Sequence, residues 1–337
     1  MKKKIYIAYT GGTIGMKKSK KGYIPISGFL QKQIKNMPEF YKKEMPIFTI
    51  HEYQPLIDSS NMTPKNWKKI AYDIQKNYKK YDGFIILHGT DTMSYTASAL
   101  SFILENLNKP VIITGSQIPL SEVRSDGRQN LLNSLFIAAH YPINEVTLFF
   151  HNKLYRGNRT TKMNANGLNA FSSPNLHPLL EIGIDIKYKY KKLKNKKNQN
   201  LLVHNISSQP ITVLTIYPGI SNKIIRNCLL KPTKGVILYT YGTGNAPQNK
   251  KFLKQLHKAA QKKIIILNLT QCFSGRVNMN NYFTGKTLFT SGIISGKDLT
   301  LEAAITKLHF LFSQNFSFNI IKEQIKKNIR GEITDSN

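Results

Sequence analysis

Two short apolar segments of strand length each end in glycine beside threonine, and this feature constrains the fold more than any other. Ile5–Tyr9 leads into Thr10-Gly11-Gly12-Thr13-Ile14, and Phe84–Leu87 leads into His88-Gly89-Thr90-Asp91-Thr92. Open α/β sheets bind ligands at the carboxyl ends of their parallel strands. A threonine there lies on exposed, tightly turned backbone, which suits a nucleophile better than a packing residue. We therefore expect an α/β fold with a two-threonine hydrolytic site where these strands end.

Strand and helix patterns alternate along the first half of the chain. The strand candidates are Ile5–Tyr9, Phe84–Leu87, Val111–Thr114 and Val146–Phe150. Thr63-Pro64 opens a helix with an N-cap and a proline at the first helical position. A second helix is predicted from about Tyr95 to Leu107. Such alternation predicts a parallel sheet covered by helices on both faces.

The alternation stops near Asp185, where a lysine-rich run follows, from Lys187 to Lys197. Such a run is typical of an exposed linker or loop, and a polyanion-binding strip is the weaker interpretation. Strands over Val213–Tyr217, Val236–Thr240 and Ile264–Leu269 and helices near Lys250–Gln261 and Leu301–Phe312 follow. We predict a larger N-terminal doubly wound parallel-sheet domain (1–184, catalytic), a Lys-rich linker (185–210) and a smaller C-terminal α/β domain (211–337).

Composition limits where such a protein can function. Its 337 residues suffice for two domains with real cores. No apolar stretch approaches the roughly 18 residues of a membrane span, and the apolar run after Met1–Lys4 is too short for a signal peptide. Cys228 and Cys272 are the only cysteines, too few for a disulfide framework or a cysteine metal site. We expect a cytoplasmic protein that begins at Met1 and has no membrane partner.

The net charge of +31 suggests at face value a nucleic-acid or acidic-membrane partner. Lysine greatly outnumbers arginine, however, and the lysines are spread along the chain rather than gathered into one arginine-rich face. No module that combines aromatic and basic residues for nucleic-acid recognition is present. We interpret the charge as a general enrichment of surface lysine and expect no specific nucleic-acid partner.

Thr13 is the candidate nucleophile. A threonine hydroxyl is inert near neutral pH until a neighbouring group removes its proton. Gly11 and Gly12 allow the backbone to approach a substrate and to direct N–H groups at a developing oxyanion. For this motif alone, an ordinary strand-to-loop turn remains the alternative. A phosphate loop is excluded because neither G-x-G-x-x-G nor a Gly-Lys-Ser/Thr ending is present.

Other polar residues near the strand ends have two interpretations each. Asp91 could bind a substrate ammonium or orient a lysine, or it could cap the following helix. The Asp58-Ser59-Ser60 segment could bind a carboxylate, although local evidence favours loop and capping chemistry. His88 is expected to be a packed residue rather than a ligand. A lysine takes a proton from a threonine such as Thr90 only where burial lowers its pKa, so Lys162 is a conditional candidate.

The paired motifs Thr10–Ile14 and His88–Thr92 resemble the signature of the bacterial-type L-asparaginases, and the resemblance extends over essentially the whole chain. The Asp58–Ser60 loop, the run Tyr155–Lys162 and the absence of a signal peptide resemble the cytoplasmic type I enzymes more than the exported type II enzymes. The resemblance implies hydrolysis of L-asparagine to L-aspartate and ammonia through a threonine acyl-enzyme. It implies no metal and no organic cofactor.

The resemblance also implies catalytic roles. Thr13 would attack the side-chain amide carbon, and Tyr23, on a flexible loop, would hydrogen-bond the Thr13 hydroxyl. Thr90, Asp91 and Lys162 would form a relay that activates the nucleophile, the water, or both. Which group is the immediate base stays open.

Substrate-binding roles are implied in the same way. Thr90 would help to bind the substrate, and Asp91 would hold its α-ammonium. Asp58, Ser59 and Ser60 would surround its α-carboxylate and α-amino end. Asn245 would come from a neighbouring subunit of a homotetramer built as a dimer of dimers.

The chain departs from relatives in two places. Type II enzymes have Gly-Ser-Gln where this chain has Asp58-Ser59-Ser60, so their finer pocket contacts do not transfer. Thr270-Gln271-Cys272 resembles part of a second, regulatory asparagine site, but a basic residue expected near Tyr239 is missing. Whether an allosteric asparagine site functions in this chain therefore stays open. The preference for asparagine over glutamine stays open, since one methylene is worth about 1–3 kcal/mol.

Two other functions are alternatives to an asparaginase. One is the asparaginase-like component of a transfer-RNA-dependent amidotransferase, which carries an extra domain ahead of the first threonine-glycine strand, whereas Thr13 lies almost at the start of this sequence. The other is a basic nucleic-acid-binding protein with a relic fold, which would bind random DNA in a salt-sensitive way. The intact set of Thr13, Thr90, Asp91 and Lys162 argues against a relic.

Overall fold

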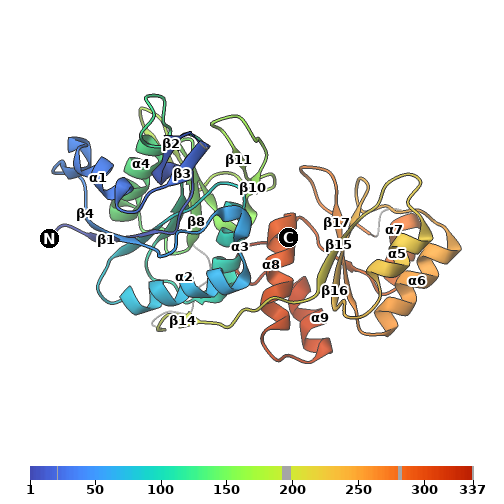
Figure 1. Ribbon diagram of the computed structural model, residues 1–337. Helices are drawn as coiled ribbons and strands as arrows, with labels where there is room; N and C mark the ends of the chain where they lie inside the picture. The colour runs from blue at the N-terminus through green and yellow to red at the C-terminus, as the bar shows by residue number, and fades with distance from the viewer. Residues whose placement is uncertain (21, 192–198, 280–282, 336–337) are drawn as a thin grey trace. The chain divides into compact units, whose positions relative to one another are not determined.

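The computed structural model describes residues 1–20, 22–191, 199–279 and 283–335 (Figure 1). The chain divides into two compact units, Met1–His204 and Asn205–Asn337. The boundary between them falls inside the segment 185–210 that was expected to be a linker. Within the described ranges, no helix is both long and apolar enough to cross a bilayer.

The first unit is built on an eight-stranded sheet in the order β13-β12-β9-β8-β7-β5-β1-β4. Five neighbouring strands are parallel: β4 (Ile47–Glu52), β1 (Lys4–Tyr9), β5 (Gly83–Leu87), β7 (Val111–Thr114) and β8 (Val146–Phe150). Four of these five are the strands predicted from sequence, with bounds that agree within one residue. The strand β4 was not predicted.

Helices cover both faces of this sheet, as the alternating pattern predicted (Figure 1). Ile5 and Ile7 of β1 pack in one core cluster with residues of α4 (Gly127–His140) and α1 (Phe29–Lys35). On the opposite face, the Tyr6 hydroxyl donates to Asp73 of α2 at 2.9 Å. The helix α2 (Pro64–Asn77) begins at the predicted Thr63 cap, and α3 (Met93–Ile103) packs against it. The doubly wound α/β class is therefore confirmed.

Three further strands each pair antiparallel with their neighbours, so the sheet is mostly rather than wholly parallel. These strands are β9 (Lys153–Arg156), β12 (Leu180–Ile182) and β13 (Ile186–Tyr188). The reversal occurs between β8 and β9 at His151 and Asn152, whose φ values are 46° and 64°. A two-residue connection with positive φ at both positions matches the twist of a hairpin, so the chain turns back instead of crossing over.

Two expected boundaries also change. The helix predicted to reach Leu107 ends at Ile103, because Leu104–Glu105 (β6) extends and pairs with Leu202–Val203 (β14). Segment 185–210 is thus not only a linker: it supplies β13 and β14 to the first unit. The last part of the lysine-rich run, within residues 192–198, lies outside the described residues.

Shorter elements complete the first unit. They are η1 (Thr13–Gly15), β2 (Met16–Ser19), β3 (Gly22–Pro25), η2 (Pro38–Tyr41), η3 (Ser59–Asn61), η4 (Gly157–Arg159), β10 (Thr161–Lys162) and β11 (Phe171–Ser172). β2 and β3 form an antiparallel hairpin directly after η1, and β10 and β11 form another.

The second unit has its own parallel sheet, in the order β15 (Ile211–Thr215), β16 (Gly235–Thr240), β17 (Ile265–Thr270) and β18 (Ile294–Ser295). Its helices are α5 (Asn222–Cys228), α6 (Lys250–Gln261), α7 (Phe283–Thr290), α8 (Leu301–Phe312) and α9 (Phe318–Lys326). Helices α6 and α8 have the predicted bounds. A buried cluster that includes Val236, Leu238, Phe252 and Leu256 forms a separate core, as expected for a second α/β domain.

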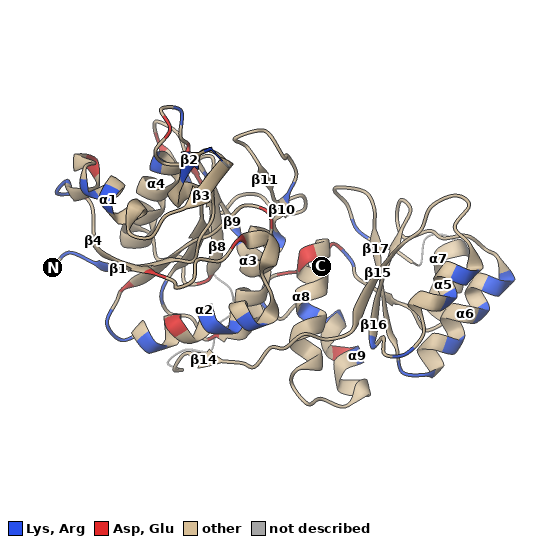
Figure 2. Ribbon diagram, in the orientation of Figure 1, with Lys and Arg blue, Asp and Glu red and all other residues tan. Residues whose placement is uncertain are grey.

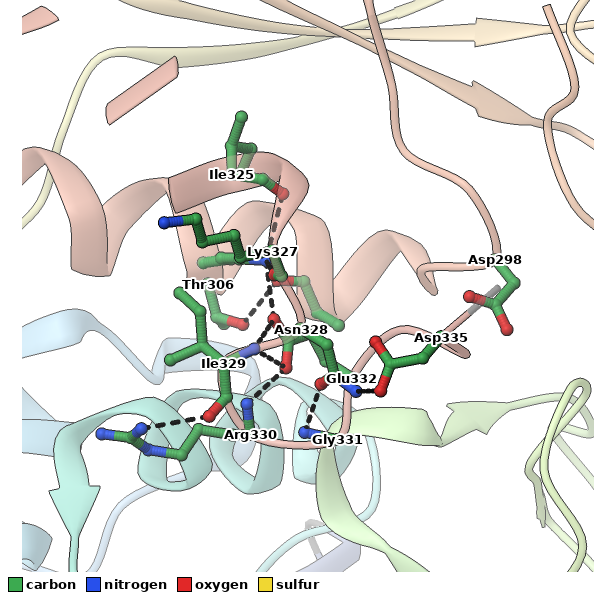
Figure 3. Close-up of polar contacts among 12 residues, drawn as sticks. Asp298, Thr306, Ile325, Lys327, Asn328, Ile329, Arg330, Gly331, Glu332 and Asp335 are labelled. Carbon is green, nitrogen blue, oxygen red and sulfur yellow. Dashed lines mark hydrogen bonds and ion pairs between the residues drawn. The ribbon is translucent and has the colours of Figure 1, made fainter. Parts of the chain in front are cut away.

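The tail after α9 is attached to α8 by a buried charge cluster, part of which Figure 3 shows. Lys307 of α8 forms an ion pair with Glu332 at 2.6 Å, and both side chains are fully buried. The Lys307 amine also donates to the carbonyls of Ile325 and Lys327. Glu332 accepts from the backbone N–H of Ile329. Every charged atom therefore has partners, which a buried ion pair requires.

Candidate active site

The two threonine motifs emerge from adjacent strands. β1 and β5 are parallel neighbours, and Tyr9 lies opposite Leu87 at their carboxyl ends. Immediately after β1, both the backbone N–H and the hydroxyl of Thr10 donate to the Leu87 carbonyl, at 3.0 and 2.8 Å. The turns that carry Thr13 and Thr90 therefore leave the sheet side by side, at the end where open α/β sheets place ligands.

Glycine permits these turns to touch through their backbones. A Cβ atom on Gly12, which has φ +94°, would lie 2.5 Å from Gly89 Cα. A Cβ atom on Gly89 would lie 2.8 Å from Ser59 Cβ. No side chain fits at either place, so the loops that carry Thr13, Ser59 and Thr90 approach one another only because these positions are glycine.

Lys162 joins the second threonine motif from a distant part of the sequence. Its amine donates to Thr90 Oγ1 at 2.9 Å and to Asp91 Oδ1 at 2.8 Å. Thr90 is buried, the Lys162 side chain is 20% exposed and the Asp91 side chain is 65% exposed. Asp91 therefore orients a lysine, which is one of the roles predicted for it from sequence. Asp91 is not the N-cap residue of the following helix, α3. That position belongs to Thr92, whose side chain makes no cap hydrogen bond.

Gln117 is a further member of this cluster, and no role was predicted for it from sequence. The Thr90 hydroxyl donates to Gln117 Oε1 at 3.0 Å. Gln117 Nε2 donates to the carbonyls of Ala165 and Gly167, at 3.1 and 3.2 Å. Since a carbonyl only accepts, these two contacts fix which end of the amide faces Thr90. Gln117 thus directs the Thr90 proton away from the Lys162 amine.

His88 is fully buried and packs as expected for a strand-end residue. Trp67 Nε1 donates to Thr96 Oγ1 at 3.0 Å, and Thr96 Oγ1 lies 2.9 Å from His88 Nε2. His88 Nδ1 lies 2.6 Å from the Gly89 carbonyl, which must accept, so Nδ1 carries the proton. Burial lowers the pKa of His88 to about 4. A neutral histidine therefore links α2 and α3 to the peptide that precedes Thr90.

The Asp58–Ser60 segment lies against both threonine turns. The backbone N–H of Ile57 donates to the Thr10 carbonyl at 2.7 Å, and Thr92 Oγ1 donates to the Ser59 carbonyl at 2.6 Å. Ser59 is buried, while Asp58 and Ser60 are exposed. Asp58 Oδ1 accepts from the Ser60 N–H at 3.0 Å, which is the capping chemistry that local sequence favoured.

Within the first unit, neither the half-buried Thr13 side chain nor Tyr23 makes a described hydrogen bond to Thr90, Asp91 or Lys162. Tyr23 is 45% exposed on β3, in the hairpin next to Thr13. Asn245 belongs to the second unit, where its Oδ1 accepts from Thr284 Oγ1 at 2.6 Å. Their roles toward Thr13 and the substrate stay predictions. No group of three or more His, Cys, Asp or Glu side chains suited to a metal occurs within the ranges that the structure describes.

Both parts of the chain match models of known protein domains. Residues 4–194 match the family model described as asparaginase, N-terminal, and residues 210–325 match the glutaminase/asparaginase C-terminal domain. The structure of L-asparaginase I from Vibrio cholerae superimposes with a TM-score of 0.93 and 57% identity, covering 99% of this chain and 100% of that one.

Among curated proteins, the chain is 61% identical to L-asparaginase 1 of Escherichia coli K12, covering 99% of this chain and 98% of that protein. It is also 30% identical to a component of the glutamyl-tRNA(Gln) amidotransferase of Pyrococcus abyssi, covering 98% of this chain and 76% of that protein. The higher identity and fuller coverage make the L-asparaginase the more similar of these two relatives. The two matched domains cover most of the sequence, and on this evidence the chain belongs to the asparaginase family of hydrolases.

Proposed function

We propose that the chain is an L-asparaginase, which hydrolyses the side-chain amide of L-asparagine to L-aspartate and ammonia. The observation that carries the proposal is the contact of the Lys162 amine with both the Thr90 hydroxyl and the Asp91 carboxylate. Family membership supports amide hydrolysis, and the high identity to an L-asparaginase over nearly the whole chain supports asparagine as the substrate. The proposed reaction uses no metal or organic cofactor.

In the proposed reaction, the Thr13 hydroxyl oxygen attacks the amide carbon while its proton passes to a neighbouring group. The resulting oxyanion is stabilised by backbone N–H groups of the glycine turn. The C–N bond then breaks, and the nitrogen takes up a proton and leaves as ammonia. This leaves an ester between Thr13 and the aspartyl group, which water hydrolyses to release aspartate and restore the threonine.

The proton transfers are assigned to Thr90, Asp91 and Lys162 acting as one unit. Lys162 donates to both partners, and its side chain is only 20% exposed to solvent. A proton shift among these three groups therefore changes the charge beside the threonine turns. Tyr23 is the proposed partner of the Thr13 hydroxyl when the β2–β3 hairpin closes over the substrate. The exposed Asp91 carboxylate has one oxygen on Lys162 and is accessible to the α-ammonium of asparagine.

The rest of the substrate site is proposed from family resemblance. Asp58, Ser59 and Ser60 surround the α-carboxylate end, and the packing of their loop against both threonine turns supports this placement. Asn245 of a neighbouring subunit completes the site in a homotetramer. We place the enzyme in the cytoplasm.

Measurement of ammonia release from purified protein, with L-asparagine and L-glutamine in parallel, tests the proposal. Thr13→Ala should abolish release, while Thr13→Ser keeps a hydroxyl and should retain measurable turnover. Lys162→Met should lower kcat much more than it changes KM, because a relay acts mainly in the transition state. Lys153→Met, at an exposed position on β9, is the matched control. Wild-type turnover by Thr13→Ala would rule out the proposed nucleophile.

A further inference from the structure

The positive charge of this protein is not evenly balanced along the chain. Residues 186–297 contain twenty lysines and arginines and no aspartate or glutamate. Thirteen of these basic residues belong to the second unit, whose five acidic residues all lie between positions 298 and 335. Figure 2 shows the resulting bands of basic residues on α5 and α6, with no acidic residue in either helix. Lysine is enriched along the whole chain, whereas the absence of carboxylates is a local feature of residues 186–297.

Helix α6 and its C-cap residue, Lys262, arrange this charge in a row. Lys250, Lys254, Lys258 and Lys262 recur at intervals of four residues, and all four are exposed. Residues four apart lie on one side of a helix, with a rise of about 6 Å between them. The apolar residues of α6, such as Phe252, pack into the core beneath. The lysine row is therefore a fixed feature of a packed helix.

The adjacent helix α5 extends the basic surface. α5 packs beside α6, and Gln255 of α6 donates to the Asn222 carbonyl at the start of α5. Lys223 and Arg226 of α5 are both exposed. We call the exposed side of α5 and α6, with these two residues and the four lysines of the row, the α5–α6 face.

Like charges four apart in a helix destabilise it by about 0.2–0.5 kcal/mol per pair. Elsewhere this chain offsets such repulsion with an acidic neighbour: Lys326 of α9 pairs with Glu323 at 3.0 Å. The α5–α6 face has no carboxylate to do so. An anionic partner that spans several lysines would remove the repulsion.

We propose that the α5–α6 face binds the phosphate backbone of nucleic acid without regard to base sequence. A row of ammonium groups matches a linear polyanion, and lysine binds phosphate as a point charge without reading base edges. An acidic membrane is the less suitable partner, because a helix that lies in a bilayer surface needs an exposed apolar face. The apolar side of α6 is committed to the core.

The proposal is tested with the full-length protein and a fluorescein-labelled DNA duplex of random sequence, about 20 base pairs long. Fluorescence anisotropy gives the dissociation constant at several salt concentrations between about 50 and 200 mM, the range over which phosphate contacts weaken steeply. The test variant is Lys250→Gln/Lys254→Gln/Lys258→Gln/Lys262→Gln. The matched control removes the same charge from exposed lysines on and after α2: Lys65→Gln/Lys76→Gln/Lys79→Gln/Lys80→Gln.

We expect the wild type and the control to bind the duplex with similar salt slopes. The α6 variant should lose about 3–4 units of slope in log K against log salt, since each phosphate contact contributes about 0.9. All three proteins should release ammonia from asparagine at equal rates, which shows that they are folded. Equal loss of slope in both variants, or no duplex binding at about 50 mM salt, would overturn the proposal. Tighter binding to phosphatidylserine vesicles than to the duplex would also overturn it, in favour of a membrane.

Discussion

At the residue scale, the site depends on which way hydroxyl and amide protons point. Thr90 receives a hydrogen bond from Lys162 and gives one to Gln117, and two backbone carbonyls hold the Gln117 amide in the required orientation. The Thr90 oxygen is thereby left as the acceptor for the lysine. Gln117 acts through the Thr90 hydroxyl and takes no part itself in the proposed proton transfers, so we regard it as a positioning residue.

Gln117→Leu should therefore lower kcat by about 10²-fold while KM changes by only a few fold, because a misplaced catalytic group costs about that much. Steady-state ammonia release measures both constants. Gln261→Leu, at the exposed end of α6, should leave both unchanged. An unaltered kcat in Gln117→Leu would show that the orientation of Thr90 does not matter to turnover.

Most of the Thr90 cluster could be predicted from sequence because its residues lie in recognisable local motifs. Thr90 and Asp91 follow a recognisable strand, and the Thr161-Lys162 segment resembles a known motif. Gln117 was missed as a site residue because its partners, the carbonyls of Ala165 and Gly167, lie about fifty residues away. One signal was available: Gln117 follows β7, which lies next to β5 in the sheet.

At the scale of elements, a buried histidine links two helices to the Thr90 loop. His88 is neutral because burial lowers its pKa to about 4, whereas the unfolded chain has a pKa near 6.5. Between these two pKa values the unfolded state binds more protons than the folded state. The free energy of unfolding therefore falls as the pH falls from about 6.5 to about 4. The loss from this one group is on the order of 3 kcal/mol.

Urea unfolding at several pH values measures this effect. His88→Gln removes the titrating group, so the free energy of unfolding should depend less steeply on pH between about 4 and 6.5. The variant is needed because burial also lowers the pKa of His309, which adds a slope of the same sign in both proteins. If wild type and variant have the same slope, His88 does not titrate as the structure indicates.

The C-terminal tail depends on another buried group. Lys307→Met leaves Glu332 buried with no cation and should destabilise the protein by about 3–5 kcal/mol. The double variant Lys307→Met/Glu332→Leu removes both charges and should recover much of that loss. Chemical denaturation of the wild type, both single variants and the double variant measures the coupling. If the effects of the two single variants simply add, the ion pair contributes nothing.

The elements predicted from sequence are those with strong periodicity. Buried strands such as Val111–Thr114 and capped helices such as Pro64–Asn77 have clear patterns and capping residues. β4 was missed because it lies at the sheet edge, where its residues are only half-buried or exposed. The antiparallel strands were not predicted because the reversal after β8 depends on positive φ at His151 and Asn152. The pair His-Asn is not a strong turn signal.

At the scale of the whole molecule, the net charge of +31 should oppose folding by self-repulsion. Added salt screens this repulsion, with a Debye length of about 10 Å at 0.1 M. Raising potassium chloride from about 0.02 to 0.3 M should therefore raise the Tm by several degrees, as measured by scanning calorimetry. The increase should be smaller in the variant with four glutamines on α6. A Tm that falls with salt would show that favourable ion pairs outweigh the excess of lysine.

The contact between Gly12 and Gly89 has a consequence for protein engineering. The two threonine turns touch through their backbones at a place with no room for a methyl group, so neither turn can be redesigned alone. Attempts to alter which amides are cleaved should leave this contact intact and vary the exposed walls beside it, at Asp58 and Ser60. Selection for new substrates should accumulate changes in those walls and leave both glycines untouched.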